Sequence, residues 1–234
     1  MSQYLYLSLT IGSILIPLLY SIFEKKFHFI QYAKITFISI VLVAIPFLIW
    51  DALFTYYGVW GFNTTYHLPI TFGGMPLGEW LFFLCIPYAC LFTSEVLTYL
   101  FPKFKISKGA VILISFIVLV LIAYLLLFNF GKWYTTVNFI IFMALLIFTL
   151  VKYPEALQTF YPNFLVLLVP FFIVNGILTG SFISEPVVWY NNNENLGFRL
   201  FTVPFEDIFY AFTLLFSSQL IFNHLKRKYH AKKS

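Results

Sequence analysis

The chain has little charge and few cysteines. Only 10% of its 234 residues are charged, whereas 61% are hydrophobic and 22% are aromatic. So small a polar fraction cannot coat a water-soluble globule, which excludes an ordinary soluble domain. The two cysteines, Cys85 and Cys90, lie in one apolar run, so they form neither a disulfide framework nor the spacing of a metal site. Water is therefore not the main solvent of this chain.

Positive charge is present, but it is confined to short segments. A formal net charge of +5 would suit nucleic-acid binding, yet the basic residues occupy turns and the C-terminal tail rather than a face interleaved with aromatic residues. No nucleic-acid partner is therefore expected. All lysines and arginines except Lys132 and Arg199 fall on one side when successive connections are assigned to alternate sides. Because cytoplasmic loops hold the excess of positive charge, we expect the N-terminus outside and the C-terminal tail in the cytoplasm.

Seven apolar runs are long enough to cross a bilayer, whose hydrocarbon core needs about 20 helical residues. The first run lacks a cleavage pattern after Glu24, so it is expected to be a retained helix. The connections near 53–77 and 182–204 contain the Gly, Pro, Asn and aromatic residues typical of ordered interfacial or re-entrant loops. We predict an all-α polytopic membrane protein with helices near 3–23, 33–52, 78–100, 109–129, 134–151, 163–181 and 205–224.

The chain contains an internal repeat. A shift of 128 positions, the separation of Asn63 and Asn191, places VWGFN on VVWYN and MPLGEWLFF on VPFEDIFYA. The shift also pairs Pro76 with Pro204 and Glu79 with Asp207.

The repeat predicts the domain organisation. Residues 1–107 are expected to form a first three-helix unit, 108–130 a connecting helix, and 131–234 a second three-helix unit with a basic cytoplasmic tail. Because one helix separates the two units, corresponding helices run in the same direction. The equivalent loops should therefore meet on one face.

Four of the few carboxylates stand at the outer ends of expected helices: Asp51, Glu79, Glu206 and Asp207. A charge at membrane depth is costly unless it is paired, protonated or used, so these residues are candidate catalytic groups. Alternatively, Pro76 and Pro204 mark ordinary helix starts, where acids are favoured by the helix dipole. Burial favours a neutral acid more strongly than the dipole favours the anion, so a dry pocket would keep one carboxyl protonated.

Aromatic and amide side chains accompany these acids. Aromatic faces can stabilise a developing carbocation, although Trp and Tyr also form interfacial belts and Phe fills membrane cores. The candidate substrate-binding residues are Trp60, Asn63, Trp80, Phe82, Phe83, Asn191, Phe209 and Tyr210.

Other polar residues have structural interpretations. Glu95 lies near the inner end of the third expected helix, where we expect it to cap that helix or pair with Lys103. Asn129, Asn138 and Asn175 are expected to form hydrogen bonds between helices. The histidines are scattered and the glycines form no dinucleotide or flavin fingerprint, so no metal or cofactor is predicted.

At these motifs the chain resembles the membrane lycopene cyclase domain family, the heterodimer-type cyclases of carotenoid-making bacteria and fungi, here with both subunits joined in one chain. The resemblance rests on WDALFTYYGVWGFN, on MPLGEWLFFLCIP, on the stretch from VVWYN to GFRLFTVPFEDIFY, and on the duplicated seven-helix pattern. The family pattern has two acids in the first motif, where this chain has Gly78 followed by Glu79.

The resemblance implies closure of the open ends of lycopene, or of a close carotenoid, into β-ionone rings in the bacterial cytoplasmic membrane. Protonation of a terminal double bond gives a tertiary cation, the neighbouring alkene closes the ring, and a base removes a proton, so the reaction has no net redox step. On this interpretation Glu206 is the acid, and Asp207, Glu79 or Asp51 is the base or a supporting partner. The expected partners are the carotenoid and lipid, with other carotenoid enzymes as candidate contacts and no oligomeric state specified.

Two alternatives use the same residues. A related isoprenoid hydratase would use the same acid together with a water molecule. A proton-coupled carrier would also combine repeats with buried acids, but its acids should lie halfway across the membrane rather than at helix ends.

Overall fold

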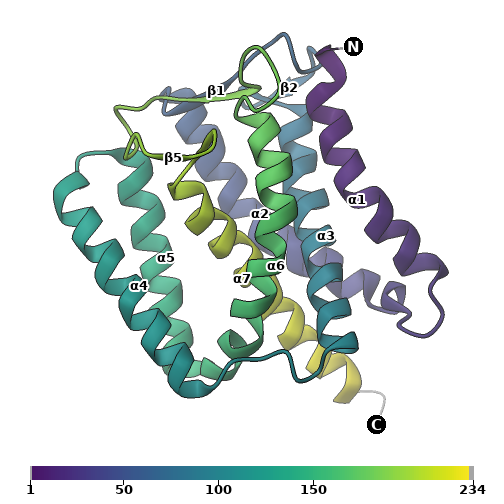
Figure 1. Cartoon of the computed structure of the whole chain (residues 1–234). Coiled ribbons are helices and arrows are strands. Elements are labelled where there is room, and N and C mark those ends of the chain that lie inside the picture. Colours follow the sequence, from purple (N-terminus) through teal and green to yellow (C-terminus); the bar gives the residue numbers. More distant parts are fainter. Residues whose placement is uncertain (1, 232–234) are drawn as a thin grey trace.

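The computed structural model describes residues 2–231, and its architecture is a bundle of long helices (Figure 1). Within this range seven helices are long and apolar enough to cross a membrane, which confirms the all-α polytopic fold. Short 3-10 segments, Ser2–Tyr4 and Phe29–Tyr32, precede the first two helices. The helices are α1 Leu5–Phe23, α2 Ala33–Tyr56, α3 Leu77–Leu100, α4 Lys108–Asn129, α5 Trp133–Lys152, α6 Pro154–Leu178 and α7 Glu206–Ala231.

Two helix boundaries differ from the prediction. α6 begins at Pro154 rather than near residue 163, because a proline in the first turn has no hydrogen bond to lose there. Pro162 and Pro170 then lie inside α6, and the carbonyl of Gln158, four residues before Pro162, accepts instead from the backbone N–H of Ile106 at 3.0 Å. α7 continues to Ala231 instead of ending near residue 224, because its polar last turns pack against the bundle.

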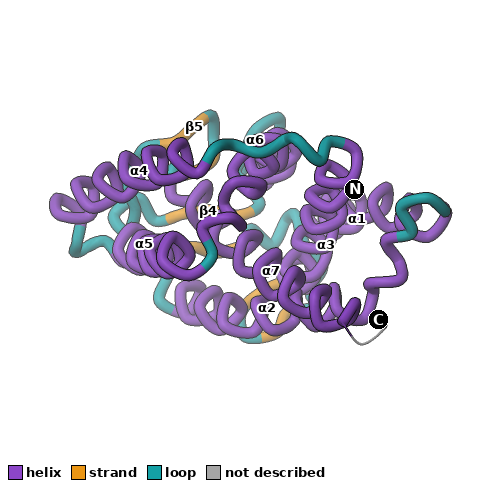
Figure 2. Tube along the Cα trace, turned by 90° about the horizontal axis from the view of Figure 1, so that it is seen from below, coloured by secondary structure: helices purple, strands orange, loops and turns teal. Residues whose placement is uncertain are grey.

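α7 lies inside the bundle, whereas α1 and α4 lie at its margins (Figure 2). Half of the α7 span is buried, compared with 17% of the spans of α1 and of α4. α7 contacts α2, α3, α5 and α6, so it joins elements of both repeats. The connecting helix α4 packs on α5 and α6 and therefore belongs, by its contacts, with the second half of the chain.

Six short strands gather at the end of the bundle that carries the N-terminus (Figure 1). The second three strands each begin 128 residues after their counterparts, so the repeat is present in the structure as well as in the sequence. The strand pairs are β1 Trp60–Phe62 with β4 Val188–Tyr190, β2 Thr71–Phe72 with β3 Met75–Pro76, and β5 Arg199–Leu200 with β6 Val203–Pro204.

The β1–β4 pair joins the two repeats. In this antiparallel pair Trp60 lies opposite Tyr190. Two equivalent backbone hydrogen bonds extend it: Asn63 N donates to Val187 O at 2.8 Å, and Asn191 N donates to Val59 O at 2.9 Å. The exchange of equivalent bonds relates the halves by an approximate two-fold axis, and it confirms that the equivalent loops meet on one face.

Candidate active site

Acids from both repeats line one cavity of about 260 Å³. The β2–β3 and β5–β6 hairpins lead directly into α3 and α7, so Glu79 and Asp207 stand in the first turns of those helices and face the cavity. Asp51 reaches the same cavity from the last turns of α2. The remaining walls are mostly apolar and come largely from α1, α3, α6 and α7. The structure therefore brings three of the four predicted acids into one apolar enclosure.

Asp51 and Glu79 form a carboxyl pair. Their side chains are 3% and 8% exposed, and the two carboxyl groups interact directly. Trp60 Nε1 donates to Asp51 Oδ1 at 2.5 Å, and the Tyr6 hydroxyl donates to Glu79 Oε2. Within residues 2–231 Asp51 Oδ2 has no hydrogen-bond donor. A proton between the two carboxyls would satisfy this oxygen, as it does in other buried carboxyl pairs.

Asp207 has a different environment. Tyr134 donates its hydroxyl to Asp207 Oδ1 at 2.5 Å, and Tyr190 donates its hydroxyl to Oδ2 at 3.0 Å. The Asn175 amide donates to the same Oδ2 at 3.4 Å. Three donors aimed at one carboxyl stabilise its anionic form. Asp207 thus has three hydrogen-bond donors, whereas Asp51 and Glu79 have one side-chain donor each.

Tyr190 belongs to the loop region above the helices and donates to Asp207 from β4. Burial, and then the neighbouring Asp207 carboxyl, raise the pKa of Tyr190 well above its ordinary value. Tyr190 therefore stays neutral and keeps its proton for the hydrogen bond. Arg199 lies 5.7 Å from the Tyr190 ring centroid and contributes a cation–π contact on the loop side.

Sequence reasoning missed the two tyrosines that hold the equivalent acids. Tyr6 of α1 and Tyr134 of α5 are 128 residues apart, and each donates to the acid of its own repeat, Glu79 or Asp207. Their backbone N–H groups also make equivalent hydrogen bonds. Tyr6 N donates to Tyr66 O at 3.1 Å, and Tyr134 N donates to Glu194 O, 128 residues after Tyr66 in the chain, at 2.9 Å. Extending the repeat alignment towards the N-terminus of each half would have revealed this pair.

Glu206, the predicted acid, lies behind the cavity wall. It is fully buried and does not line the cavity. Its Oε1 accepts from the Thr135 hydroxyl at 2.6 Å and from Leu196 N at 2.7 Å, which ties α7 to α5 and to the preceding loop. The role of Glu206 stays a prediction, but this geometry favours the carboxyls that face the cavity.

The first-half equivalent of Glu206 is Gly78, and the structure gives a steric reason for the glycine. A Cβ atom at Gly78 would lie 2.8 Å from Tyr6 Cγ. Real Cβ atoms do not approach so closely, so any larger residue would displace the tyrosine from Glu79. Glycine at position 78, where the family pattern has an acid, therefore allows α1 and α3 to pack closely.

Three of the predicted aromatic residues line the cavity: Trp60, Phe82 and Tyr210. The Trp60 ring lies 5.1 Å from the Tyr134 ring and 6.4 Å from the Tyr210 ring. Phe83 and Phe209 do not line the cavity but pack in hydrophobic clusters. These aromatic rings line the same cavity as the carboxyl groups.

The remaining predicted site residues lie outside the cavity. Asn63 and Asn191 each accept a backbone hydrogen bond two residues onward, at 3.0 and 3.1 Å, and so stabilise equivalent turns. Trp80 Nε1 donates to Phe72 O at 3.1 Å. Pro76 and Pro204 are buried in the strands that lead into α3 and α7.

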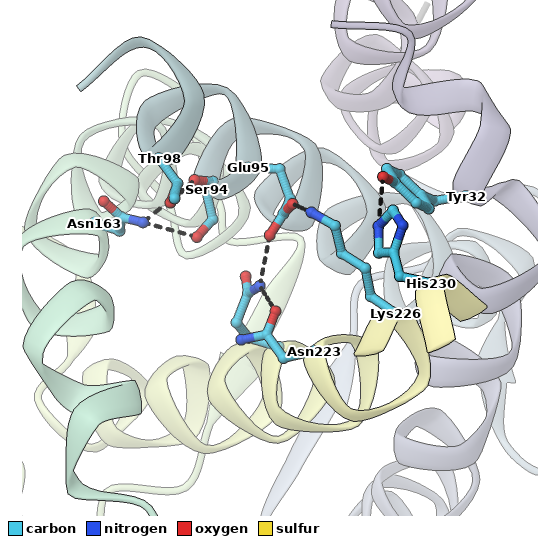
Figure 3. A network of polar contacts seen from close by, with 9 residues as sticks. Tyr32, Ser94, Glu95, Thr98, Asn163, Asn223, Lys226 and His230 are labelled. Atoms are coloured by element: carbon cyan, nitrogen blue, oxygen red, sulfur yellow. Dashed lines mark hydrogen bonds and ion pairs between the residues drawn. The ribbon is translucent and has the colours of Figure 1, made fainter. Parts of the chain in front are cut away.

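Two predictions about other polar residues were wrong in part. Glu95 does not pair with Lys103; it pairs with Lys226 of α7 and accepts a hydrogen bond from Gln219 at 3.2 Å (Figure 3). The longer α7 explains the difference, because it brings its last turns beside α3.

Two of the three asparagines that were expected to form hydrogen bonds between helices do so. Asn138 donates to Glu206 O and Asn175 donates to Asp207, so these two join helices as predicted. Asn129 instead donates to Leu125 O within its own helix. Among residues 2–231 no three His, Cys, Asp or Glu side chains are close enough to hold a metal ion.

The fold and the cavity define a polytopic membrane protein with buried carboxyl groups in a mostly apolar pocket. The sequence model of the lycopene cyclase family matches the chain twice, over residues 3–97 and 131–225. The chain therefore belongs to the lycopene cyclase family, with the two matched segments fused in one chain. No curated protein and no solved structure matches it. Family membership supports a carotenoid-cyclase function.

Proposed function

We propose that this protein is a lycopene β-cyclase that closes the ends of its substrate by acid-initiated, cation-mediated cyclisation. The observation that carries the proposal is that a carboxyl pair and a separately hydrogen-bonded carboxyl line the same apolar cavity. The family match supports the carotenoid substrate, and the cavity geometry supports the division between acid and base.

The Asp51–Glu79 pair is the proposed acid. The proton shared by the pair moves to the terminal double bond of the substrate, which leaves a tertiary carbocation and an anionic carboxyl pair. Trp60 hydrogen-bonds Asp51, and Tyr6 hydrogen-bonds Glu79, so the negative charge that develops on the pair has two donors to stabilise it.

Asp207 is the proposed base. After protonation, the neighbouring alkene attacks the cation and forms the new carbon–carbon bond of the ring. Asp207 then takes a proton from the carbon beside the ring cation, and the electrons of that C–H bond form the ring double bond. One proton enters the substrate and one leaves it, so the step is an isomerisation that needs no redox cofactor.

The cavity walls protect the cation. The faces of Trp60 and Tyr210 stabilise positive charge, and the mostly apolar lining keeps water away from it. Water capture of the same cation would give a hydrated product, so a dry wall favours ring closure over the hydratase alternative.

Pigment analysis in lycopene-accumulating bacteria tests the proposal. The unchanged protein should convert lycopene into β-ring products. Glu79→Gln and Asp207→Asn should lower conversion by about 10²–10⁴-fold, because each removes a proton-transfer group. The matched control is Glu206→Gln, which neutralises an equally buried acid that does not line the cavity. Its folded fraction should retain cyclisation.

Detergent-extracted variants must elute as intact protein, so that loss of folding is separated from loss of chemistry. If folded Glu206→Gln were inactive while Asp207→Asn stayed active, the acid would be Glu206. If the folded, unchanged protein left lycopene untouched, the carrier alternative would replace the cyclase proposal.

The same proposal places the protein in the bacterial cytoplasmic membrane, with the carboxyl site near the outer face and the C-terminus in the cytoplasm. Lysines and arginines outnumber acids in the connections assigned to the inner side, which supports this orientation. With Cys85 and Cys90 replaced by serine, single cysteines introduced at Thr64 and at Lys105 can be labelled with a membrane-impermeant reagent, which should mark only the first in intact cells.

A further inference from the structure

The cavity that holds the carboxyl groups continues well beyond them. On α3 its lining runs from Glu79 to Thr93, which are separated by 14 residues, or about 21 Å at the helical rise. Phe82, Ile86 and Ala89 line it in between, each three or four residues from the next, so one face of α3 forms the whole wall. The proposed mechanism uses only the outer end of this cavity.

The deeper part of the cavity offers an apolar surface. The Thr93 hydroxyl donates to Ala89 O at 2.8 Å, and the Ser13 hydroxyl donates to Thr10 O at 2.6 Å, so both hydroxyl protons are used within their own helices. The other side chains that α1 and α6 add at this depth are apolar: Pro17, Leu167, Pro170, Phe171 and Val174. Such a lining suits a hydrocarbon chain.

The cavity is closed at its carboxyl end and along its α7 wall. Glu79 and Asp207 are buried at the outer end, as is Leu178, the last residue of α6. Leu214 and Leu215 of α7 line the cavity farther in and are buried as well. A molecule that reaches the carboxyl groups therefore has to enter from another side.

The deeper part of the cavity is open on the side between α1 and α6. Ser13 and Pro17 of α1 and Phe171 of α6 line the cavity but are only half-buried. Pro170 of α6 also lines it and is exposed. In a bundle that crosses a membrane, an exposed side chain in the middle of a helix faces lipid chains rather than water. The cavity therefore opens sideways to the hydrocarbon region of the bilayer.

The packing of α1 explains why the opening lies at this depth. α1 and α6 meet at their outer ends, where Tyr6 and Leu178 belong to one hydrophobic cluster and Leu9 and Val174 pack against it. Farther along the chain α1 leans away from α6 (Figure 1) and packs mainly on α3. The two helices therefore close the cavity near the carboxyl groups and leave it open below them.

We propose that the reacting end of the carotenoid enters this cavity sideways from the bilayer, between α1 and α6, while the far end of the polyene stays in lipid. This inference rests on the proposed cyclase function. A linear carotenoid can span the hydrocarbon core, about 30 Å, whereas the cavity runs for about 21 Å, so part of the chain remains outside. The substrate class is therefore polyenes with one open end, whatever group the far end carries.

Enlarging the far end of the substrate tests this inference on the unchanged protein. A one-ring carotenoid with a hydroxyl group on its ring keeps one open end, and a long-chain fatty-acyl ester of that hydroxyl makes the far end bulkier without adding charge. In vesicles that contain the purified protein, the alcohol and the ester should be cyclised at similar rates. A loss of about tenfold or more for the ester would overturn the inference, because the far end would then have to fit inside the protein.

Variants that narrow the opening test its position. Ser13→Trp on α1 and Ala89→Trp on α3 each add an indole ring at a half-buried residue of the deeper part. Both should lower the cyclisation of lycopene by about tenfold or more. The matched control is Ile16→Trp, because Ile16 lies on the same helix as Ser13 but is 74% exposed and does not line the cavity. It should cyclise lycopene normally.

Activity is taken per folded protein, measured by elution in detergent. Normal cyclisation by folded Ser13→Trp and Ala89→Trp protein, or an equal loss in Ile16→Trp, would overturn the inference. If both filled variants fail to fold, the comparison of alcohol and ester decides. A protein that cyclises lycopene but neither one-ring carotenoid would also overturn the inference, because it would sense the far end. Failure of the proposed function is different, since the unchanged protein would then cyclise none of the three.

Discussion

At the residue scale, the fully buried Glu206 depends on the Thr135 hydroxyl, which donates to its carboxyl at 2.6 Å. Thr135→Val keeps the shape of the side chain but leaves Oε1 with only its backbone donor. We expect stability to fall by about 1–3 kcal/mol, the usual cost of removing a partner from a buried polar group. The thermal midpoint of detergent-solubilised protein measures this loss.

Thr149→Val is the matched control, because Thr149 is also fully buried on α5 but donates only to Leu145 O in its own helix. Its effect should be clearly smaller. Both variants should convert lycopene normally when corrected for folded protein. A large loss of turnover in stable Thr135→Val protein would instead assign Glu206 a direct part in the reaction.

Single residues were predictable where the repeat and the scarcity of charge marked them. Asp51, Glu79 and Asp207 were selected because carboxylates are rare and costly in a membrane, and all three line the cavity. Tyr6 and Tyr134 were not selected, because one more tyrosine among 16 carries no local signal. Which carboxyl faces the cavity was also not predictable for the adjacent Glu206 and Asp207, since it depends on side-chain direction.

At the scale of elements, the start of α3 packs tightly on α1 through Gly78. A Cβ atom there would lie 2.8 Å from Cγ of Tyr6, whose ring is buried and hydrogen-bonded to Glu79. Gly78→Ala should therefore lower stability by about 1–3 kcal/mol and displace the tyrosine, which should also reduce cyclisation. Thermal unfolding and pigment analysis measure the two effects.

Gly109→Ala is its control, because Gly109 is likewise the second residue of a helix, α4, but a Cβ there would meet nothing within 4 Å. It should leave activity unchanged and stability equal or slightly higher, since alanine favours helix more than glycine does. Equal behaviour of the two variants would contradict the close α1–α3 packing.

Most helices could be predicted because a membrane span needs a long apolar run, and five of the seven agree with the prediction within a few residues. The exceptions have local causes. α6 begins at Pro154, earlier than predicted, and a proline in the first turn is compatible with a helix. The polar end of α7 remains helical because Lys226 pairs with Glu95 of α3, a contact that sequence periodicity cannot show.

At the scale of the whole molecule, the approximate two-fold arrangement divides the chain between α3 and α4. The contacts between the halves include those of α1 with α6, of α2 with α7, of α3 with α6 and α7, and of β1 with β4, while the main contacts of α4 are with α5 and α6 of the second half. The cavity takes its acids from both sides of this division: Asp51 and Glu79 from the first, Asp207 from the second.

A chain cut in the connection at 101–107 should therefore reassemble in the membrane. We expect co-expression of residues 1–104 with residues 105–234 to restore cyclisation of lycopene, because helix association in a membrane depends on packing rather than on chain continuity. Each fragment alone should be inactive, since it lacks one of the proposed proton-transfer partners. A cut within α6, between Val166 and Leu167, is the control; it interrupts the α6 wall of the carboxyl cavity and should abolish activity even when both fragments are inserted. Activity from the first fragment alone would show that the acid and the base do not come from different halves.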